Sequence, residues 1–499
     1  MSWLNRVCVG RSHKQVFLYG LAIVLVGLLL RLYSLERGLW YDEVSSLQLA
    51  STEDFWRSAR GYDHPPLYFL ILRGWIKFTS SPPWLRLLSV FFSCGTIVFL
   101  MLWLRLINFR AVFIGGWLAA CSPGLLSFSQ EIRGYALLAC LTSLSLWALE
   151  MLLTASCRRG KAAKTFTALW LGCSLCAAVA VHLVAVFFIP ALVVYSHVRL
   201  KRLWLHGVLH HVYAAACAAL LLFILLYSWF LRGARHSYLE GWWMPQPSLK
   251  LIASTLVELL GLPQMLEGLM FVPPVYTPAA ILFFFGCLGV LVWCLSGADF
   301  RPALPSLLLF LTGYAGILLY SIFFISVFIS RTLLFLIPPL IGSVALLCAG
   351  ILQRRVYLAA QTLFVMLSAL GALRWVMWEA PQERVPWSEM VSTLDAALAT
   401  WPEAARREVI ITGYPFDALV MLEYKTGSLW KGRSRLATEF VCRNAPPVFF
   451  HIFHYRNFMP QHELEIHNRF LEHTAVCGYA RQEIFSKKGL TLYRFYKQA

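Results

Sequence analysis

Long apolar runs recur through most of this 499-residue chain, from Val16 to Val376. Each run has roughly the 20 residues that a helix needs to cross the hydrocarbon core of a bilayer. Hydrophobic residues make up 59% of the chain and charged residues only 14%, far from the mixed composition of a soluble globular protein. The sequence therefore predicts a mainly α-helical, polytopic membrane protein.

We expect about eleven membrane-spanning helices. They lie near residues 16–32, 84–105, 111–128, 135–155, 165–184, 185–199, 207–231, 278–296, 303–329, 333–352 and 356–376. No small-residue cleavage site follows the first run, so it is interpreted as a retained helix and not as a signal peptide. The segment from Pro66 to Phe78 is short and carries Arg73 and Lys77, so it is interpreted as re-entrant or interfacial.

Basic clusters between the apolar runs set the expected orientation. The net charge of +18 comes largely from short clusters such as Arg6 to Lys14 and Arg199 to Arg202. Such clusters are typical of the cytoplasmic loops of membrane proteins, so no nucleic-acid partner is expected. With the clusters in the cytoplasm, the N-terminus lies inside and the C-terminal tail lies outside.

Two domains are expected, with a boundary near residue 376. Residues 1–376 form the transmembrane domain, and the helical and strand-like patterns of residues 377–499 predict a small α/β accessory domain on the extracytoplasmic, periplasmic side. This tail has no glycine-rich phosphate loop, which disfavours a nucleotide site. Its two cysteines, Cys442 and Cys477, would be able to pair in an oxidising compartment, but the sequence leaves their separation open.

Two adjacent carboxylates, Asp42 and Glu43, follow the first predicted span. Alone, they are better explained as part of a hydrated loop that faces water. Asp63 and His64 then precede two prolines and Tyr68 at the start of the next helix, where Asp63 would also serve as a helix cap. Together the three acids and the histidine would hold a divalent metal ion or orient a hydroxyl, although their spacing identifies no metal.

Other polar residues are expected at the outer ends of later spans. Glu131 and Arg133 precede Tyr135 between two spans, where they would either serve a site or pair as surface charges. Arg331 lies between two long apolar spans; an arginine there would snorkel to the interface or bind a phosphate. His182 is the weakest candidate, because a lone histidine on an apolar helix is more often packed than used as a ligand.

These motifs occur in an order that resembles the GT-C membrane glycosyltransferases. The residues that carry the resemblance are Trp40-Tyr41-Asp42-Glu43, Asp63-His64-Pro65-Pro66-Leu67-Tyr68, Arg86-Leu87-Leu88-Ser89, Glu131-Ile132-Arg133-Gly134-Tyr135, and Arg331 before Pro338. Within that superfamily, about the first 350 residues are similar to the bacterial branch related to protein O-mannosyltransferases and lipid A aminoarabinose transferases.

The resemblance implies a GT-C helix bundle that catalyses an inverting sugar transfer. The donor would be a monosaccharide on a polyprenyl phosphate, and the acceptor a hydroxyl on the outer face of a bacterial inner membrane. Such a reaction requires no nucleotide or redox cofactor. The acceptor stays open: a protein, lipid A, a polysaccharide or another lipid.

The same resemblance implies roles for the acidic motifs. Asp42 matches the catalytic aspartate, a general base for the acceptor hydroxyl, and Glu43 would support it or help to bind a metal. Asp63 and His64 match residues that contact a metal or the lipid phosphate in relatives.

The resemblance also places two cations near the donor. Arg133 and Arg331 match positions suited to offset charge on the departing polyprenyl phosphate. Relatives often have a tyrosine after the second arginine, where this chain has Thr332. The competing hypothesis is a permease or flippase for a lipid-linked sugar, motivated by the many spans and by Arg73 at membrane depth. Most charge lies at helix ends and in loops, which favours the enzyme.

Overall fold

The computed structural model describes residues 13–60, 62, 64–155, 161–203, 208–234, 244–259, 299–351, 353–379, 386–399, 401, 409–414, 416–426, 434–440, 446–454, 461–487 and 490–497. The chain forms two compact units, each described here by itself. The first unit comprises residues 1–35, 49–234 and 246–381, and the second comprises residues 36–48, 235–245 and 382–499.

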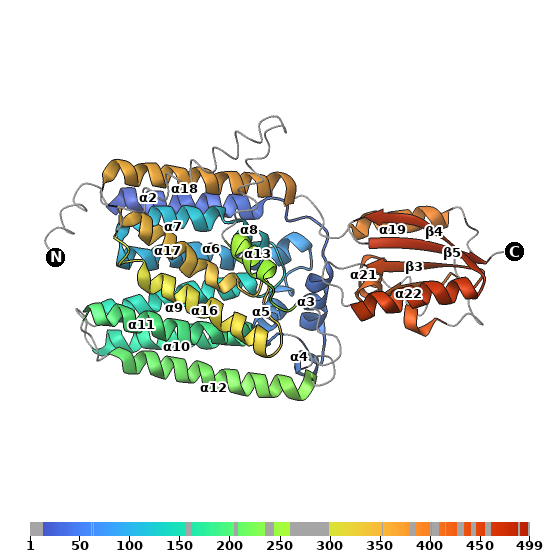
Figure 1. Cartoon of the computed structure of the whole chain (residues 1–499), viewed down its shortest axis with the longest axis horizontal. Coiled ribbons are helices and arrows are strands. Elements are labelled where there is room, and N and C mark those ends of the chain that lie inside the picture. Colours follow the sequence, from blue (N-terminus) through green and yellow to red (C-terminus); the bar gives the residue numbers. More distant parts are fainter. Residues whose placement is uncertain are drawn as a thin grey trace. The chain divides into compact units, whose positions relative to one another are not determined.

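The first unit is a bundle of long helices that run side by side (Figure 1). Its elements are α2 (His13–Leu32), α4 (Phe55–Arg60), α5 (Leu67–Trp75), α6 (Pro82–Ile107), α7 (Phe109–Cys121), α8 (Pro123–Ser129), α9 (Tyr135–Ala155), α10 (Lys161–Val181), η1 (Leu183–Phe187), α11 (Phe188–Leu203), α12 (Leu209–Ala234), α13 (Leu249–Leu259), α16 (Leu304–Phe323), η4 (Leu334–Leu336), α17 (Ile337–Ala349), α18 (Arg354–Arg374) and η5 (Trp375–Glu379). Helix α3 (Tyr41–Ser51) crosses the boundary between the units.

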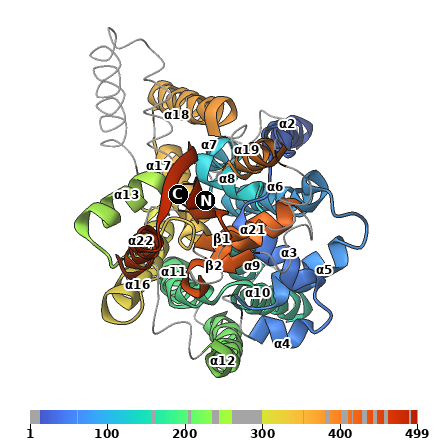
Figure 2. The same cartoon turned by 90° about the vertical axis from the view of Figure 1, so that its right-hand side faces the viewer.

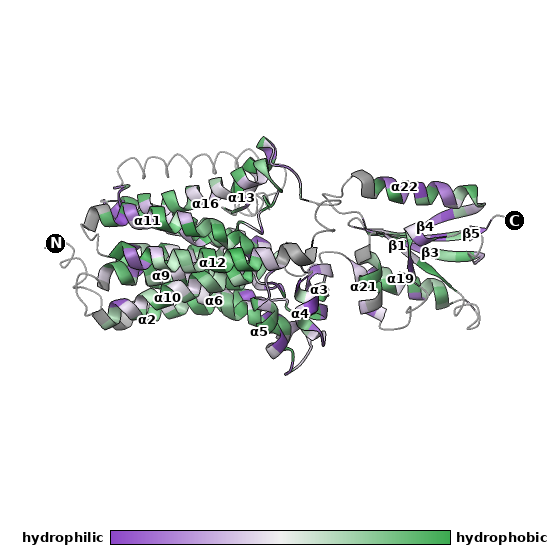
Figure 3. Cartoon of the chain, turned by 90° about the horizontal axis from the view of Figure 1, so that it is seen from below, coloured by the Kyte–Doolittle hydropathy of each residue, from purple (hydrophilic) through white to green (hydrophobic). Residues whose placement is uncertain are grey.

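Within the described ranges, seven helices are long and apolar enough to cross a membrane, or eight if the bent pair α7 and α8 is one span. Two shorter apolar helices, Phe17–Leu32 and Leu334–Ala349, lie where two further spans are expected. Hydrophobic residues cover most of the bundle helices (Figure 3). The predicted polytopic membrane bundle is confirmed, while the expected span at 278–296 lies outside the described residues.

The expected span at 111–128 is not one straight helix. Helix α7 ends at Cys121, and α8 starts at Pro123 with its axis turned by 52°. The cause is local: a proline disfavours helical geometry in the residue before it, and Ser122 has the extended ψ of 117°. The Ser122 hydroxyl then accepts a hydrogen bond from the Leu125 backbone N–H and so caps α8.

Helix α5 is too short to cross a bilayer. It has 9 residues, or about 14 Å of helix, against a hydrocarbon core of about 30 Å. The Arg73 guanidinium donates to the backbone carbonyls of Ala50 and Thr52, which ties α5 to the chain that precedes α4. The segment from Pro66 to Phe78 therefore does not form a full span, as its length predicts.

Among the spans that the structure describes, helix α9 is the most enclosed. Of its most apolar window, 78% is buried, against 22% for α12 and 28% for α18. The latter two lie at opposite edges of the bundle, which both cartoon views show (Figures 1 and 2). The residues at the start of α9 are therefore shielded by other helices, whereas α12 presents much of its surface outward.

The second unit contains a five-stranded sheet in the order β2-β1-β3-β5-β4. Its elements are α19 (Trp387–Ala399), β1 (Ile411–Tyr414), α21 (Phe416–Thr426), β2 (Ser434–Leu436), η7 (Ala437–Glu439), β3 (Val448–His454), α22 (Gln461–Val476), β4 (Tyr479–Lys487) and β5 (Leu490–Lys497). Strand β1 pairs in parallel with β2 and β3, and β5 pairs antiparallel with β3 and β4. Helix α22 covers one face, and α19 and α21 cover the other (Figure 3).

Two histidines are buried between this sheet and α22. His451 Nε2 lies 3.3 Å from His467 Nδ1, and the Thr412 hydroxyl lies 2.9 Å from His451 Nδ1. Burial, then the neighbouring His467 and Arg481, hold the pKa of His451 well below its usual 6.5. Burial and Arg481 lower the pKa of His467 to about 4. Both imidazoles are therefore neutral in the folded domain at neutral pH.

Acid is expected to destabilise this domain. Below pH 6.5 the unfolded chain takes up protons that the folded histidines do not, so stability is complete above pH 6.5 and falls towards about pH 4. In the full-length protein, pH-corrected hydrogen-exchange protection of β3 and α22 should fall by at most about tenfold per pH unit for each histidine. His467→Phe should flatten this dependence, and a substitution of the exposed His473 to Asn should not. Protection that is constant from pH 7 to 4.5 would refute this expectation.

Cys477, at the end of α22, is disulfide-bonded. Cys442 lies outside the described residues, so its pairing with Cys477 stays a prediction. Disulfides persist mainly in oxidising compartments.

Candidate functional site

The segment that enters α9 is held by three hydrogen bonds, two to the chain at the end of α2 and one from α6. The Gln130 side-chain amide donates to the carbonyls of Arg31 and Tyr33, and the Ser89 hydroxyl of α6 donates to the carbonyl of Glu131. Glu131 is 1% exposed and Arg133 is 5% exposed. These two candidate residues are therefore buried in the bundle and are not a surface charge pair.

Arg133 joins two residues of the loop before α5. Its guanidinium donates to the Tyr62 hydroxyl over 2.9 Å and reaches His64 Nε2 over 2.7 Å. It also lies 5.9 Å from the centroid of the Tyr135 ring. Asp63, between the two contacted residues, lies outside the described residues. Two candidates from separate sequence motifs, His64 and Arg133, are thus in direct contact in the structure.

His182 lies where helix α10 ends and the 3₁₀ helix η1 begins. Its extended backbone stops α10, and its Nδ1 accepts a hydrogen bond from the Val184 backbone N–H over 3.3 Å. Its ring centroid is 4.5 Å from that of His64 and 5.7 Å from that of Tyr135. The weakest sequence candidate therefore lies inside the cluster.

Arg331 lies near the same cluster, in the turn before η4. It acts electrostatically on both His64 and His182. The neighbouring Thr332 hydroxyl donates to the carbonyls of Val327 and Ile329, so this residue shapes the turn. Four segments far apart in sequence thus bring together two arginines and two imidazoles.

Burial and the nearby positive charge both favour a neutral His64. Burial has the largest effect and the positive charge of Arg133 the next, and together with His182 and Arg331 they hold the pKa of His64 well below 6.5. A cluster with two permanent cations and uncharged imidazoles suits an anionic ligand.

Tyr68 and Gly134 bring the first turn of α5 against the start of α9. Tyr68 is 1% exposed, and a Cβ added to Gly134 would lie 3.3 Å from the Tyr68 Cβ and 2.9 Å from Val181 Cγ1. A larger residue at position 134 would therefore push the start of α9 away from Tyr68 of α5 and from Val181 at the end of α10.

Asp42 and Glu43 form the first turn of α3, in the second unit. Glu43 is buried, and its carboxylate accepts a hydrogen bond from the Trp40 backbone N–H over 3.3 Å. The Ser46 hydroxyl donates to the Asp42 carbonyl. Glu43 thus has a capping role in its own segment, whereas Asp42 is partly exposed.

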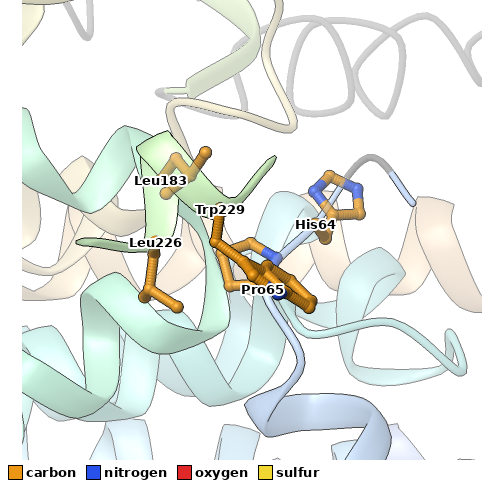
Figure 4. Close-up of a pocket in the computed structure, with 5 residues that line it drawn as sticks. All are labelled: His64, Pro65, Leu183, Leu226 and Trp229. Atoms are coloured by element: carbon orange, nitrogen blue, oxygen red, sulfur yellow. The ribbon is translucent and has the colours of Figure 1, made fainter. Parts of the chain in front are cut away.

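A shallow pocket, without room for an enclosed water molecule, lies beside His64 (Figure 4). Its other walls are Pro65, Leu183 of η1, and Leu226 and Trp229 of α12. Of these wall residues, only Pro65 belongs to a motif visible in the sequence; Leu183, Leu226, Trp229 and the nearby Tyr62 are not among the sequence candidates. The apolar residues carry no signal in an apolar chain, whereas Tyr62, next to the Asp63-His64 motif, was identifiable as a neighbour.

The described residues do not fit a metal site built on His64. They contain no group of three or more His, Cys, Asp or Glu side chains placed to hold a metal ion. The lone pair of His64 Nε2 is already directed at the Arg133 guanidinium, which has only hydrogen-bond donors. Metal binding by Asp42, Glu43 and Asp63 stays a prediction.

The GT-C-like fold that the motifs predict is confirmed by its similarity to solved structures. Over 96% of this chain and 98% of the other, it superposes on the apo crystal structure of ArnT from Cupriavidus metallidurans with a TM-score of 0.56 and 14% identity. The undecaprenyl phosphate-bound structure of that ArnT aligns over 97% and 98%, with a TM-score of 0.54 and 14% identity. No protein-family model and no curated protein sequence matches this chain. These similarities establish the fold.

Proposed function

We propose that this chain is a membrane glycosyltransferase that moves a monosaccharide from a polyprenyl phosphate to an acceptor hydroxyl. The observation that carries the proposal is the cluster of the buried Arg133 and His182 with the half-buried His64 and Arg331, in a fold shared with a protein that binds undecaprenyl phosphate. Two cations at a lipid-facing bundle suit a phosphate whose hydrocarbon chain stays in the membrane.

The proposed reaction needs one base and one anion site. The Asp42 carboxylate takes the proton of the acceptor hydroxyl as its oxygen attacks the anomeric carbon from the face opposite the phosphate. The bond between that carbon and the phosphate oxygen breaks, and the lipid phosphate leaves with the electron pair. Arg133 and Arg331 stabilise its charge. The sugar configuration is therefore inverted.

The remaining candidate residues have supporting roles in this proposal. Glu43 fixes the first turn of α3, and Asp63 would orient the acceptor or bind a metal. Tyr68, Glu131 and Tyr135 shape the walls around the two arginines and the imidazoles. Any metal requirement would be detected as a loss of activity with chelator that added divalent ions reverse.

We also propose a bacterial inner membrane location with a cytoplasmic N-terminus and a periplasmic or extracellular active site and C-terminal domain. The basic clusters between spans support this orientation. The disulfide at Cys477 supports an oxidising compartment for the tail.

Filling the pocket beside His64 is expected to impair transfer. Leu226→Trp replaces a small aliphatic side chain with a bulky indole ring against His64 and Trp229. It should lower kcat/KM at least about tenfold, equivalent to about 1.4 kcal/mol. The matched control is Leu225→Trp, because Leu225 is 57% exposed on the same helix. Equal activity of the two variants would show that the pocket is not used.

Reconstitution with a panel of polyprenyl-phosphate sugars tests the proposed function. The purified protein in proteoliposomes should cleave at least one donor into free polyprenyl phosphate and a glycosylated acceptor. Movement of an intact lipid-linked sugar between leaflets, without cleavage, would instead identify a flippase and refute the proposal.

A further inference from the structure

Two buried ring nitrogens in the cluster lack an acceptor among the residues that the structure describes: His64 Nδ1 and His182 Nε2. A buried polar group without a partner costs about 1–3 kcal/mol, so such atoms in a binding site mark the place of a ligand. Their protonation decides which ligand they accept.

The tautomer of His64 follows from its contact with Arg133. A guanidinium has N–H donors and no acceptor, so at 2.7 Å His64 Nε2 must supply the lone pair. In a neutral imidazole the proton is then on Nδ1. His64 Nδ1 is therefore a donor.

The tautomer of His182 is set by the backbone. The Val184 N–H donates to His182 Nδ1 over 3.3 Å, because His182 caps η1 with its side chain. The proton is then on Nε2, the buried atom without an acceptor. His182 thus presents a second donor, from a ring whose centroid is 4.5 Å from that of His64.

We propose that His64 and His182 are a pair of neutral hydrogen-bond donors with fixed tautomers, which bind an anionic phosphate oxygen. This inference rests on the proposed function only for the identity of the phosphate as that of the lipid donor. A metal ion needs lone pairs, and a general base needs one too, but both open nitrogens carry protons. Arg133 and Arg331 supply the charge, and the imidazoles supply direction.

Substitutions at His182 separate a donor from the alternatives. Binding of undecaprenyl phosphate in nanodiscs is measured for wild type, His182→Phe and His182→Gln. The apolar ring removes the donor and should weaken binding by about 10- to 100-fold, as loss of a hydrogen bond to a charged group does. The glutamine amide keeps an N–H donor and should stay within about threefold of wild type. His210→Phe, at an exposed histidine of α12, should bind as wild type does.

Three results would overturn the donor pair. They are normal binding by His182→Phe, a glutamine variant as weak as the phenylalanine variant although folded, and binding by wild type that divalent metal strengthens and chelator weakens. The metal titration uses the unaltered protein, so the inference remains testable even if a variant fails to fold.

Inorganic phosphate separates the two possible ligand sources. If inorganic phosphate competes with undecaprenyl phosphate, and if His182→Phe weakens this competition, the pair binds the phosphate group itself. A wild-type protein that binds the phosphate but cleaves no sugar donor contradicts the proposed function and leaves the donor pair standing. Sugar transfer with normal phosphate binding by His182→Phe contradicts the donor pair alone.

Discussion

Asp42→Asn is expected to lower sugar transfer at least about a hundredfold, because general base catalysis contributes about 10²- to 10⁴-fold. The carboxamide has nearly the same size as the carboxylate, but it does not take a proton from the acceptor hydroxyl. Asparagine is also tolerated at the start of a helix, so α3 should be retained. The measurements are the initial rate of donor cleavage and the melting temperature in detergent.

Asp54→Asn is the matched control for this variant. Asp54 is exposed just before α4, and its replacement should leave both the rate and the melting temperature unchanged. Full activity of Asp42→Asn would remove the proposed base. A melting temperature that falls together with the rate would assign Asp42 a structural role instead.

Arg133→Met is expected to have a comparably large effect for a different reason. The buried guanidinium contacts both the Tyr62 hydroxyl and His64 Nε2. Its removal should lower kcat/KM at least about a hundredfold, the loss seen when one donor to a developing negative charge is deleted. Arg133→Lys keeps the positive charge but does not contact Tyr62 and His64 through two separate nitrogens, so it should retain intermediate activity.

The control for this prediction is Arg57→Met. Arg57 is exposed on α4, so its replacement should change kcat/KM by less than about twofold, as expected for a surface substitution. The dissociation constant for undecaprenyl phosphate should rise in Arg133→Met and stay constant in the control. Unchanged phosphate binding in Arg133→Met would show that this arginine does not hold the leaving group.

Most of the bundle was predictable because the physical requirement is simple. A helix must present about 20 apolar residues to cross the hydrocarbon core, and runs of that length are visible without knowledge of tertiary contacts. The bend between Cys121 and Pro123 was missed, although the Ser122-Pro123 pair carried the signal. The length of the apolar run indicates one straight span, whereas the backbone preference of the residue before proline determines the bend.

The site was only partly predictable. Charged and polar residues are conspicuous in an apolar chain, so Arg133, His64 and Arg331 were identifiable as candidates. Their convergence depends on how the helices pack, which includes the close approach at Gly134. Leu226 and Trp229 were not identifiable, because an apolar residue that lines a pocket looks the same in sequence as one that faces lipid.

The most direct test of the central claim is the stoichiometry of donor cleavage by the purified protein. With a labelled polyprenyl-phosphate sugar and its acceptor in one membrane, glycosylated acceptor and free polyprenyl phosphate should appear in equal amounts. Both products should be absent with Asp42→Asn. Recovery of all the label as intact donor, from a folded wild-type protein with every sugar in the panel, would contradict the proposed glycosyl transfer.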